Sequence, residues 1–168
     1  MSDFSKAPSS GTYKAMKSIF KQLASDQVLC KYLYYPSENM DDDPTLKADL
    51  TPEQIFEVIK ITERVDELEN PNEIKRGRIN FGLGFRPRSY NNHKASRQTF
   101  LVYIFMPREG FDSVDFRTAA CIDRIDQLLS NSAFEGTFGR IVKEDSNPFE
   151  SPKGYEGYLL RYQFSDTD

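Results

Sequence analysis

The sequence lacks tryptophan, and it has a single histidine and only two cysteines. Zinc sites usually need several histidines or cysteines, and a thiol nucleophile needs a cysteine with a base such as histidine nearby. The shortage of both residues therefore argues against most classes of metalloenzyme and cysteine-dependent enzyme. Cys30 and Cys121 are far apart and form no CxxC pair. This usage suits a reducing compartment, and a single disulfide between the two cysteines is the alternative.

Long apolar runs are also missing. No segment approaches the roughly 20 apolar residues that a membrane-spanning helix needs. The opening MSDFSKAPSSGTYK lacks the apolar core of a secretory signal. We therefore expect no membrane partner.

The 168 residues include 13 Phe and 9 Tyr, which supply enough bulk for a core although only 38% of the residues are hydrophobic. We predict a single domain over residues 1–168. Within it, residues 1–10 form a flexible arm, 11–74 an N-terminal helical and acidic-loop part, and 75–165 a hairpin-helix-strand core.

Charge is divided along the chain, although the net charge is only -4. Residues 37–74 carry three basic and twelve acidic side chains, net -9, whereas residues 75–108 carry eight basic and no acidic ones, net +8. The flanking segments, 1–36 and 109–168, carry +3 and -6. A long stretch without any carboxylate is unusual in so acidic a protein, and it marks a candidate surface.

Three helices are predicted in the first 60 residues. The first begins near Tyr13, with an apolar stripe at Tyr13, Met16, Phe20 and Leu23. Ser25 or Asp26 caps a second, short helix that ends before Pro36. Thr51, followed by a proline and by Gln54 three residues on, predicts the start of a third helix from Pro52 to about Lys60.

The basic segment reads as two strands joined by the loop RSYNNHKASR. In the first, residues 79–85, apolar residues including Leu83 alternate with small or polar ones, so one face is apolar and the other almost bare. The second, Thr99–Met106, is continuously apolar, which predicts burial on both faces by the chain's own helices or by another subunit.

The last third predicts a helix over about 114–130, with Ile122, Ile125 and Leu129 buried and with Asp123, Arg124 and Asp126 in solvent. A strand through Ile141 and Val142, the loop 144–154 and a final strand over 158–164 follow. The order helices-β-β-α-β-β predicts an α+β fold, with an antiparallel sheet of about four strands covered by helices on one face.

No catalytic constellation can be assembled. His93 sits in a polar loop, where a solvated histidine is the simpler interpretation than a general base. Asp123 and Asp126 share a helix face, and exposure of that face to solvent accounts for the pair more simply than acid–base catalysis does. Gly82 and Gly84 lack the third glycine of a dinucleotide-binding loop. Asp41–Asp43 could gather a hard cation, but they lack the spacing of an EF-hand loop. We expect no enzyme activity, no catalytic residues, no cofactor and no metal.

The two charged segments suit a contact between copies. Two molecules meeting head to tail would pair the -9 segment with the +8 segment, a heterologous contact that closes into a ring when the rotation permits. Two alternatives stay open: the segments neutralise each other within one molecule, or the basic hairpin binds nucleic acid. The residues proposed for the interface are Arg86, Arg88, Lys94, Arg97, Asp41, Asp42 and Asp43.

The chain resembles the tail terminator, or tail-completion, proteins of the tailed-bacteriophage neck. The likeness rests on five short stretches in the same order as in that family, covering most of the chain beyond the arm. They are VLCKYLYYP (28–36), DDDPTL (41–46), LTPEQIFEVI (50–59), DFRTAACIDRIDQLL (115–129) and GYLLRYQF (157–164).

This resemblance implies a structural virion protein that forms a ring, typically a hexamer, at the end of the finished tail tube. It implies the tube protein and the head-to-tail connector as partners, DNA only by passage through the ring, and no cofactor or active site. The implied location is the virion neck, with assembly in the host cytoplasm. A head-side adaptor or stopper is the structural alternative, and a soluble nucleic-acid-associated module is the non-structural one.

Overall fold

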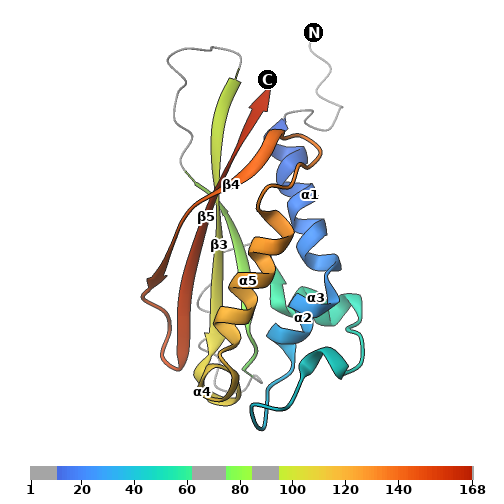
Figure 1. The fold of residues 1–168 in the computed structure, drawn as a ribbon, viewed down its shortest axis with the longest axis vertical. Coiled ribbons are helices and arrows are strands. Elements are labelled where there is room, and N and C mark those ends of the chain that lie inside the picture. The colour runs from blue at the N-terminus through green and yellow to red at the C-terminus, as the bar shows by residue number, and fades with distance from the viewer. Residues whose placement is uncertain (1–10, 62–74, 85–94, 168) are drawn as a thin grey trace.

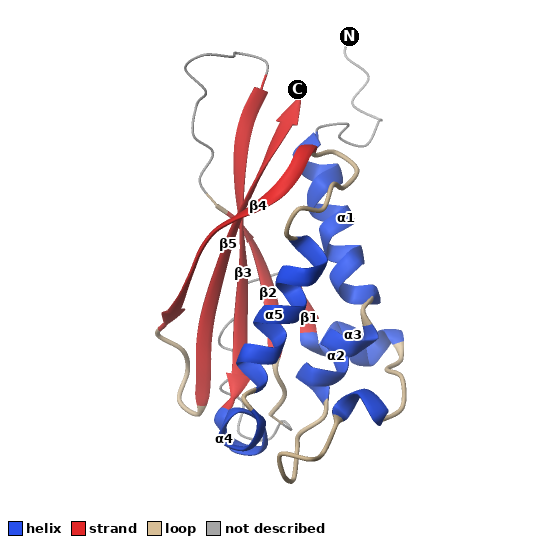
Figure 2. Cartoon of the chain, viewed as in Figure 1, coloured by secondary structure: helices blue, strands red, loops and turns tan. Residues whose placement is uncertain are grey.

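The structure is a computed structural model, and it describes residues 11–61, 75–84 and 95–167. Figure 1 shows an elongated arrangement in which long strands form one layer and the helices gather on one side of it. The same separation of helix from strand is seen in Figure 2. The predicted α+β fold, with helices covering one face of the sheet, is confirmed.

The helical part begins with α1 (Gly11–Ser25), α2 (Gln27–Tyr34), the short turn η1 (Pro44–Leu46) and α3 (Pro52–Val58). The starts of α2 and α3 follow the predicted caps. Asp26 accepts a hydrogen bond from the backbone N–H of Leu29 at 2.8 Å, and Thr51 and Gln54 form a reciprocal capping box. These caps are local, so the sequence alone is enough to predict them.

The buried stripe of α1 keeps the predicted Leu23 but otherwise differs from the prediction. Ala15, Ile19 and Leu23 are fully buried, whereas Tyr13 is 47% exposed. The predicted Met16 and Phe20 pack only at the edge of the core. The helix is rotated because its inner face follows the sheet and helix α5 (Arg117–Leu129), which the local pattern does not encode.

The sheet has five strands in the order β1-β2-β3-β5-β4. The strands are β1 (Ile59–Lys60), β2 (Arg78–Leu83), β3 (Ala95–Pro107), β4 (Phe138–Phe149) and β5 (Tyr155–Thr167). All neighbouring pairs are antiparallel except β1 with β2, which is parallel. The prediction of about four strands missed β1 and ran the third helix to about Lys60, whereas α3 ends at Val58 and Ile59–Lys60 form β1. Two residues directly after a helix carry no readable alternation.

The predicted loop 144–154 is wrong over its first half. Residues 144–149 continue β4, with Asn147 opposite Leu159 and Phe149 opposite Gly157 on β5. Pro148 suggested a loop, but β4 is an edge strand, where a missing N–H need not break a ladder. The long neighbour β5 supplies the pairing that the composition hides.

The single helix predicted for 114–130 is interrupted. An irregular turn, η3 (Arg108–Asp112), leads into one turn of helix, α4 (Ser113–Asp115), and α5 starts afresh at Arg117. Phe116, between the two, has left-handed backbone angles, φ 44° and ψ 42°. Ile125 and Leu129 are fully buried as predicted, together with Cys121, whereas Ile122 is only partly buried.

The core lies between the helices and one face of the sheet, where Val102, Ile104, Leu160 and Tyr162 are fully buried. On the other face, Phe105 and Tyr155 form a small second cluster. The predicted burial of β3 on both faces is complete on the core face but only partial on the other, where Phe105 is buried and Tyr103 is partly buried. Leu83, predicted to lie on an apolar face, is 61% exposed at the end of β2.

Among the described helices, none is both long enough and apolar enough to cross a bilayer.

Candidate assembly interface

The acidic loop after α2 is partly neutralised by its own neighbours. The Asp42 carboxylate pairs with the Lys47 ammonium at 2.8 Å. Asp43 caps η1 by accepting a hydrogen bond from the backbone N–H of Thr45 at 2.8 Å. Asp42 and Asp43 therefore fold the loop, although Asp43 is exposed, and Asp41 is exposed as well.

These contacts favour the charged forms of the side chains. The hydrogen bond from Lys47 holds the pKa of Asp42 below its usual value. The same contact raises the pKa of Lys47. Hydrogen bonds from the side chain and then the backbone of Thr45 lower the pKa of Asp43. The loop is thus an anionic, hydrogen-bonded structure at neutral pH.

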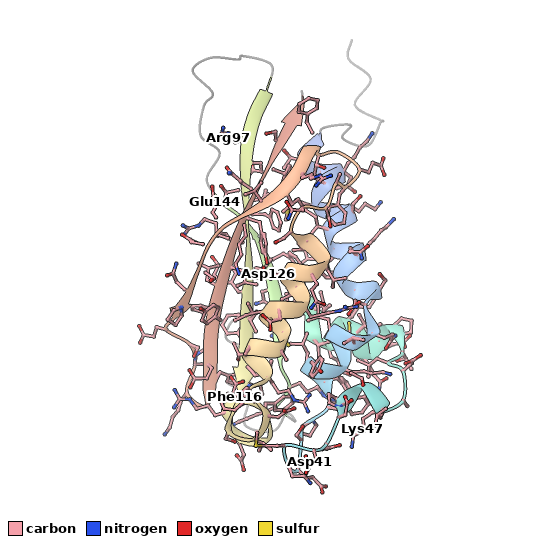
Figure 3. The ribbon with its side chains drawn as sticks, viewed as in Figure 1. Asp41, Lys47, Arg97, Phe116, Asp126 and Glu144 are labelled. Atoms are coloured by element: carbon pink, nitrogen blue, oxygen red, sulfur yellow. The ribbon has the colours of Figure 1, made fainter. Side chains whose placement is uncertain are left out.

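Arg97 is exposed near the start of β3, opposite Ser165 of β5. The other predicted basic interface residues, Arg86, Arg88 and Lys94, lie outside the described residues, as does His93. Figure 3 places Asp41 and Lys47 at one end of the long axis and Arg97 toward the other. The acidic loop and Arg97 therefore do not meet within one molecule, and their role in an interface stays a prediction.

Neutralisation within the molecule, the open alternative, is seen between Arg76 and Glu57. Arg76 pairs with Glu57 of α3 at 3.2 Å, and its guanidinium lies 3.4 Å from the ring centroid of Tyr34. This contact joins the basic segment to the acidic one. Another basic residue of the segment, Arg108, instead pairs with Glu156 on β5 at 2.7 Å.

The corner between α4 and α5 is a feature that sequence reasoning missed. Arg117 has no exposed surface, donates hydrogen bonds to the Ser37 hydroxyl and the Tyr32 carbonyl, and pairs with Asp115 at 2.6 Å. The available signal was Arg117 itself, since it continues the buried stripe of α5 by one turn toward the N-terminus. A charged residue at such a position is buried only with partners.

Phe116 is the exposed counterpart of Arg117. Its side chain is 71% exposed, and it lies at the same end of the molecule as Asp41 and Lys47 (Figure 3). The end that carries the acidic loop therefore also presents an aromatic ring. Nothing in the local sequence predicts this, because a left-handed phenylalanine has no pattern of its own.

The carboxylates of α5 differ from their prediction. Asp123 is exposed as expected, but Asp126 is half-buried, accepting hydrogen bonds from the Tyr162 hydroxyl and, at 2.5 Å, from the Lys143 ammonium. Arg124 is also half-buried and pairs with Asp26 at 2.6 Å. Asp126 and Arg124 tie α5 to β4, β5 and the start of α2, rather than forming a wet face.

The described residues offer little for catalysis. They contain no group of three or more His, Cys, Asp or Glu side chains placed to hold a metal ion. Cys30 and Cys121 are both free and buried. Burial raises the pKa of Cys30 to about 12 and also raises that of Cys121. Both thiols are therefore protonated at neutral pH and poorly suited to act as nucleophiles.

These observations define a small α+β protein whose notable features lie at the two ends of an elongated sheet-and-helix body. The model of the YomW family matches residues 26–164, and the chain belongs to this phage-associated family. No curated protein matches the sequence.

One solved structure shares the fold over almost the full length of this protein. It is a chain of the "Virion of native gene transfer agent (GTA) particle", with a TM-score of 0.62 and 9% sequence identity, covering 96% of this chain and 100% of that chain. A second solved chain aligns with a TM-score of 0.35 and 13% identity over 60% of this chain and 76% of that one, which is too low to establish a shared fold.

Proposed function

We propose that this protein is a non-enzymatic structural virion protein that assembles into a ring, a hexamer, at the neck of a tailed phage. The ring terminates the tail tube and joins it to the head connector. Its partners are further copies of itself, the tube protein and the neck proteins, and DNA only passes through its centre.

The observation that carries this proposal is the shared fold with a chain of a gene transfer agent particle, over 96% of this chain and all of the other. Membership of a phage-associated family agrees with it. The five sequence stretches that resemble tail terminators narrow the proposal to the neck. Asp41 and Arg97, toward opposite ends of the long axis, support a head-to-tail contact.

Two of the described basic residues, Arg76 and Arg108, give little support to the nucleic-acid alternative. Arg76 is engaged with Glu57 and Tyr34, and Arg108 with Glu156. A nucleic-acid surface needs cations that are free to displace counterions from phosphates. A head-side adaptor would use the same surfaces as a tail terminator, so position within the particle separates these two.

The test is the assembly state of the purified protein as salt is raised. Sedimentation velocity and electron microscopy should show rings at low salt and a shift toward monomer near 1 M salt, since exposed charge pairs are screened. Arg97→Glu should weaken the ring, and adding Asp41→Lys to the same chain should restore it. Lys21→Glu, the same charge change on the exposed side of α1, is the matched control.

Two outcomes would contradict the proposal. One is a salt-independent monomer at high concentration that also fails to form rings on purified tail tubes. The other is retention on DNA at physiological salt with no self-association, which would favour the nucleic-acid module.

A further inference from the structure

Phe116 occupies a backbone conformation that disfavours it. Its φ of 44° and ψ of 42° lie in the left-handed region, where the Cβ of an L-residue approaches the carbonyl oxygen. Glycine enters this region without that penalty, and asparagine or aspartate enters it more easily than a bulky residue does. Phe116 and Asn131 are the non-glycine residues with positive φ among those described.

The contacts around Phe116 hold the strained turn in place. On its C-terminal side, Arg117 is anchored inside the protein by Ser37 and Asp115. One residue further, the backbone N–H and hydroxyl of Thr118 both donate to the carboxylate of Asp112, the N–H at 2.7 Å. These contacts hold both flanks of position 116.

The phenyl ring receives little in return within the molecule, since 71% of it is exposed. A glycine would make the same turn with less strain, and a polar residue would suit the solvent better. Strained residues that persist on a surface point to a use beyond folding. The burial that this ring lacks in one molecule is available from a second one.

The surroundings of Phe116 describe the surface that it would meet. Met40 and Leu46, in the acidic loop, are 67% and 84% exposed. The loop is joined to the Phe116 corner through Ser37, which binds Arg117 and donates its backbone N–H to the Gly110 carbonyl at 2.7 Å. This end is therefore apolar with carboxylates around it, and its complement is an apolar patch beside a cation.

Such a patch lies on the sheet at the other end of the molecule. Phe138 and Val142 of β4 are 64% and 49% exposed. Phe138 and Arg97 both lie opposite Ser165, one on each side of β5. Adjacent strands are about 4.8 Å apart, and only β5 separates the two residues. The ring and the guanidinium therefore belong to one stretch of surface.

We infer that Phe116 is an assembly anchor that packs against Phe138 and Val142 of the next copy, with the acidic loop facing Arg97 of that copy. The inference rests on the proposed ring and identifies the residues of its contact. The contact is heterologous, since each copy offers its Phe116 end to one neighbour and its Phe138 patch to the other. An aromatic side chain of this kind is typical of an interface hot spot.

Phe116→Gly separates the anchoring role from a role in folding. The variant should keep the melting temperature of the wild type or exceed it, because the turn is no longer strained. Its dissociation constant for self-assembly should rise by at least about 30-fold, as for loss of a hot-spot aromatic. Sedimentation velocity over a concentration series, with thermal unfolding of the same samples, measures both quantities.

Three further variants sharpen the result. Phe116→Asn, which also suits a left-handed turn, should behave like Phe116→Gly. The double substitution Phe138→Ser with Val142→Ser should weaken assembly similarly from the opposite side of the contact. Phe56→Ala is the control, since Phe56 is another exposed phenylalanine, on α3, and should assemble with the wild-type constant.

The wild type and the variants fail differently. If Phe116→Gly forms rings at the same concentration as the wild type, Phe116 is not an assembly anchor, and the proposed ring is unaffected. Unfolding of both position-116 variants shows a structural role and overturns the anchor too. Variants that form normal rings but no longer join tail tubes show that Phe116 meets another protein, which overturns the contact between copies. A wild type that never assembles overturns the ring and the anchor together.

Discussion

Arg117 at the start of α5 donates a hydrogen bond to the hydroxyl of Ser37, 80 residues earlier in the chain, and both residues are buried. The contact fastens the acidic loop to the corner that presents Phe116. The geometry of the end that carries the acidic loop and Phe116 therefore depends on the buried Arg117 rather than on the exposed charges that stand out in the sequence.

Replacing Arg117 with alanine should strongly destabilise the fold. The change leaves Asp115 without its partner and opens a space inside the protein. We expect the free energy of unfolding to fall by about 3 kcal/mol, the lower part of the range for breaking a buried ion pair. Urea titration measures this free energy.

Arg108→Ala is the control, because Arg108 and Glu156 are 64% and 49% exposed and such pairs contribute below about 1 kcal/mol. Equal losses in the two variants would contradict the buried network.

The Tyr162 hydroxyl is the next testable contact, since it joins β5 to Asp126 of α5 inside the protein. Tyr162→Phe should lower the free energy of unfolding by about 1–2 kcal/mol, because Asp126 loses a donor to a charged acceptor. Tyr158→Phe, four residues earlier on the same strand, should change the free energy of unfolding by less than about 0.5 kcal/mol. If Tyr162→Phe leaves the free energy of unfolding unchanged, water replaces the hydroxyl as the donor to Asp126 without a loss of stability.

Acid should loosen the loop that carries Asp42 and Asp43. Their pKa values are lowered in the folded state by Lys47 and Thr45. A lowered folded pKa gives stability that is complete above the unfolded value, about pH 3.9, and is lost as pH falls through the folded one. The amide signal of Thr45 should therefore shift with a midpoint below about pH 3.9. In Asp43→Asn that shift should vanish, and a midpoint above pH 4 in the wild type would refute the assignment.

Neither cysteine should react in the native state. Cys30 and Cys121 are fully buried, and burial raises the pKa of both thiols. A maleimide or disulfide reagent at pH 7.5 should label no thiol until denaturant is added, and two thereafter. Labelling at the rate of a free peptide thiol without denaturant would show that the packing of α2 against α5 opens readily.

Several elements were predictable because their signals are local. Asp26 and the Thr51–Gln54 pair lie within a few residues of the groups that they cap, and the alternation in β2 and β5 needs no partner to be seen. The Asp41–Asp43 loop and Arg97 were proposed for the interface from charge alone, and that role stays a prediction. What each charge does was not predictable, since Asp42 and Asp43 proved to be committed to Lys47 and Thr45.

The sequence by itself determined the order of most elements, the α+β class and the division of charge that directs attention to assembly. Only the tertiary structure decided that β1 pairs parallel to β2, that residues 144–149 extend β4, and that Phe116 breaks a helix to stand in solvent. The reason is physical: caps and alternation act over a few residues, whereas strand pairing and the anchoring of Arg117 by Ser37 depend on groups brought together by the whole fold.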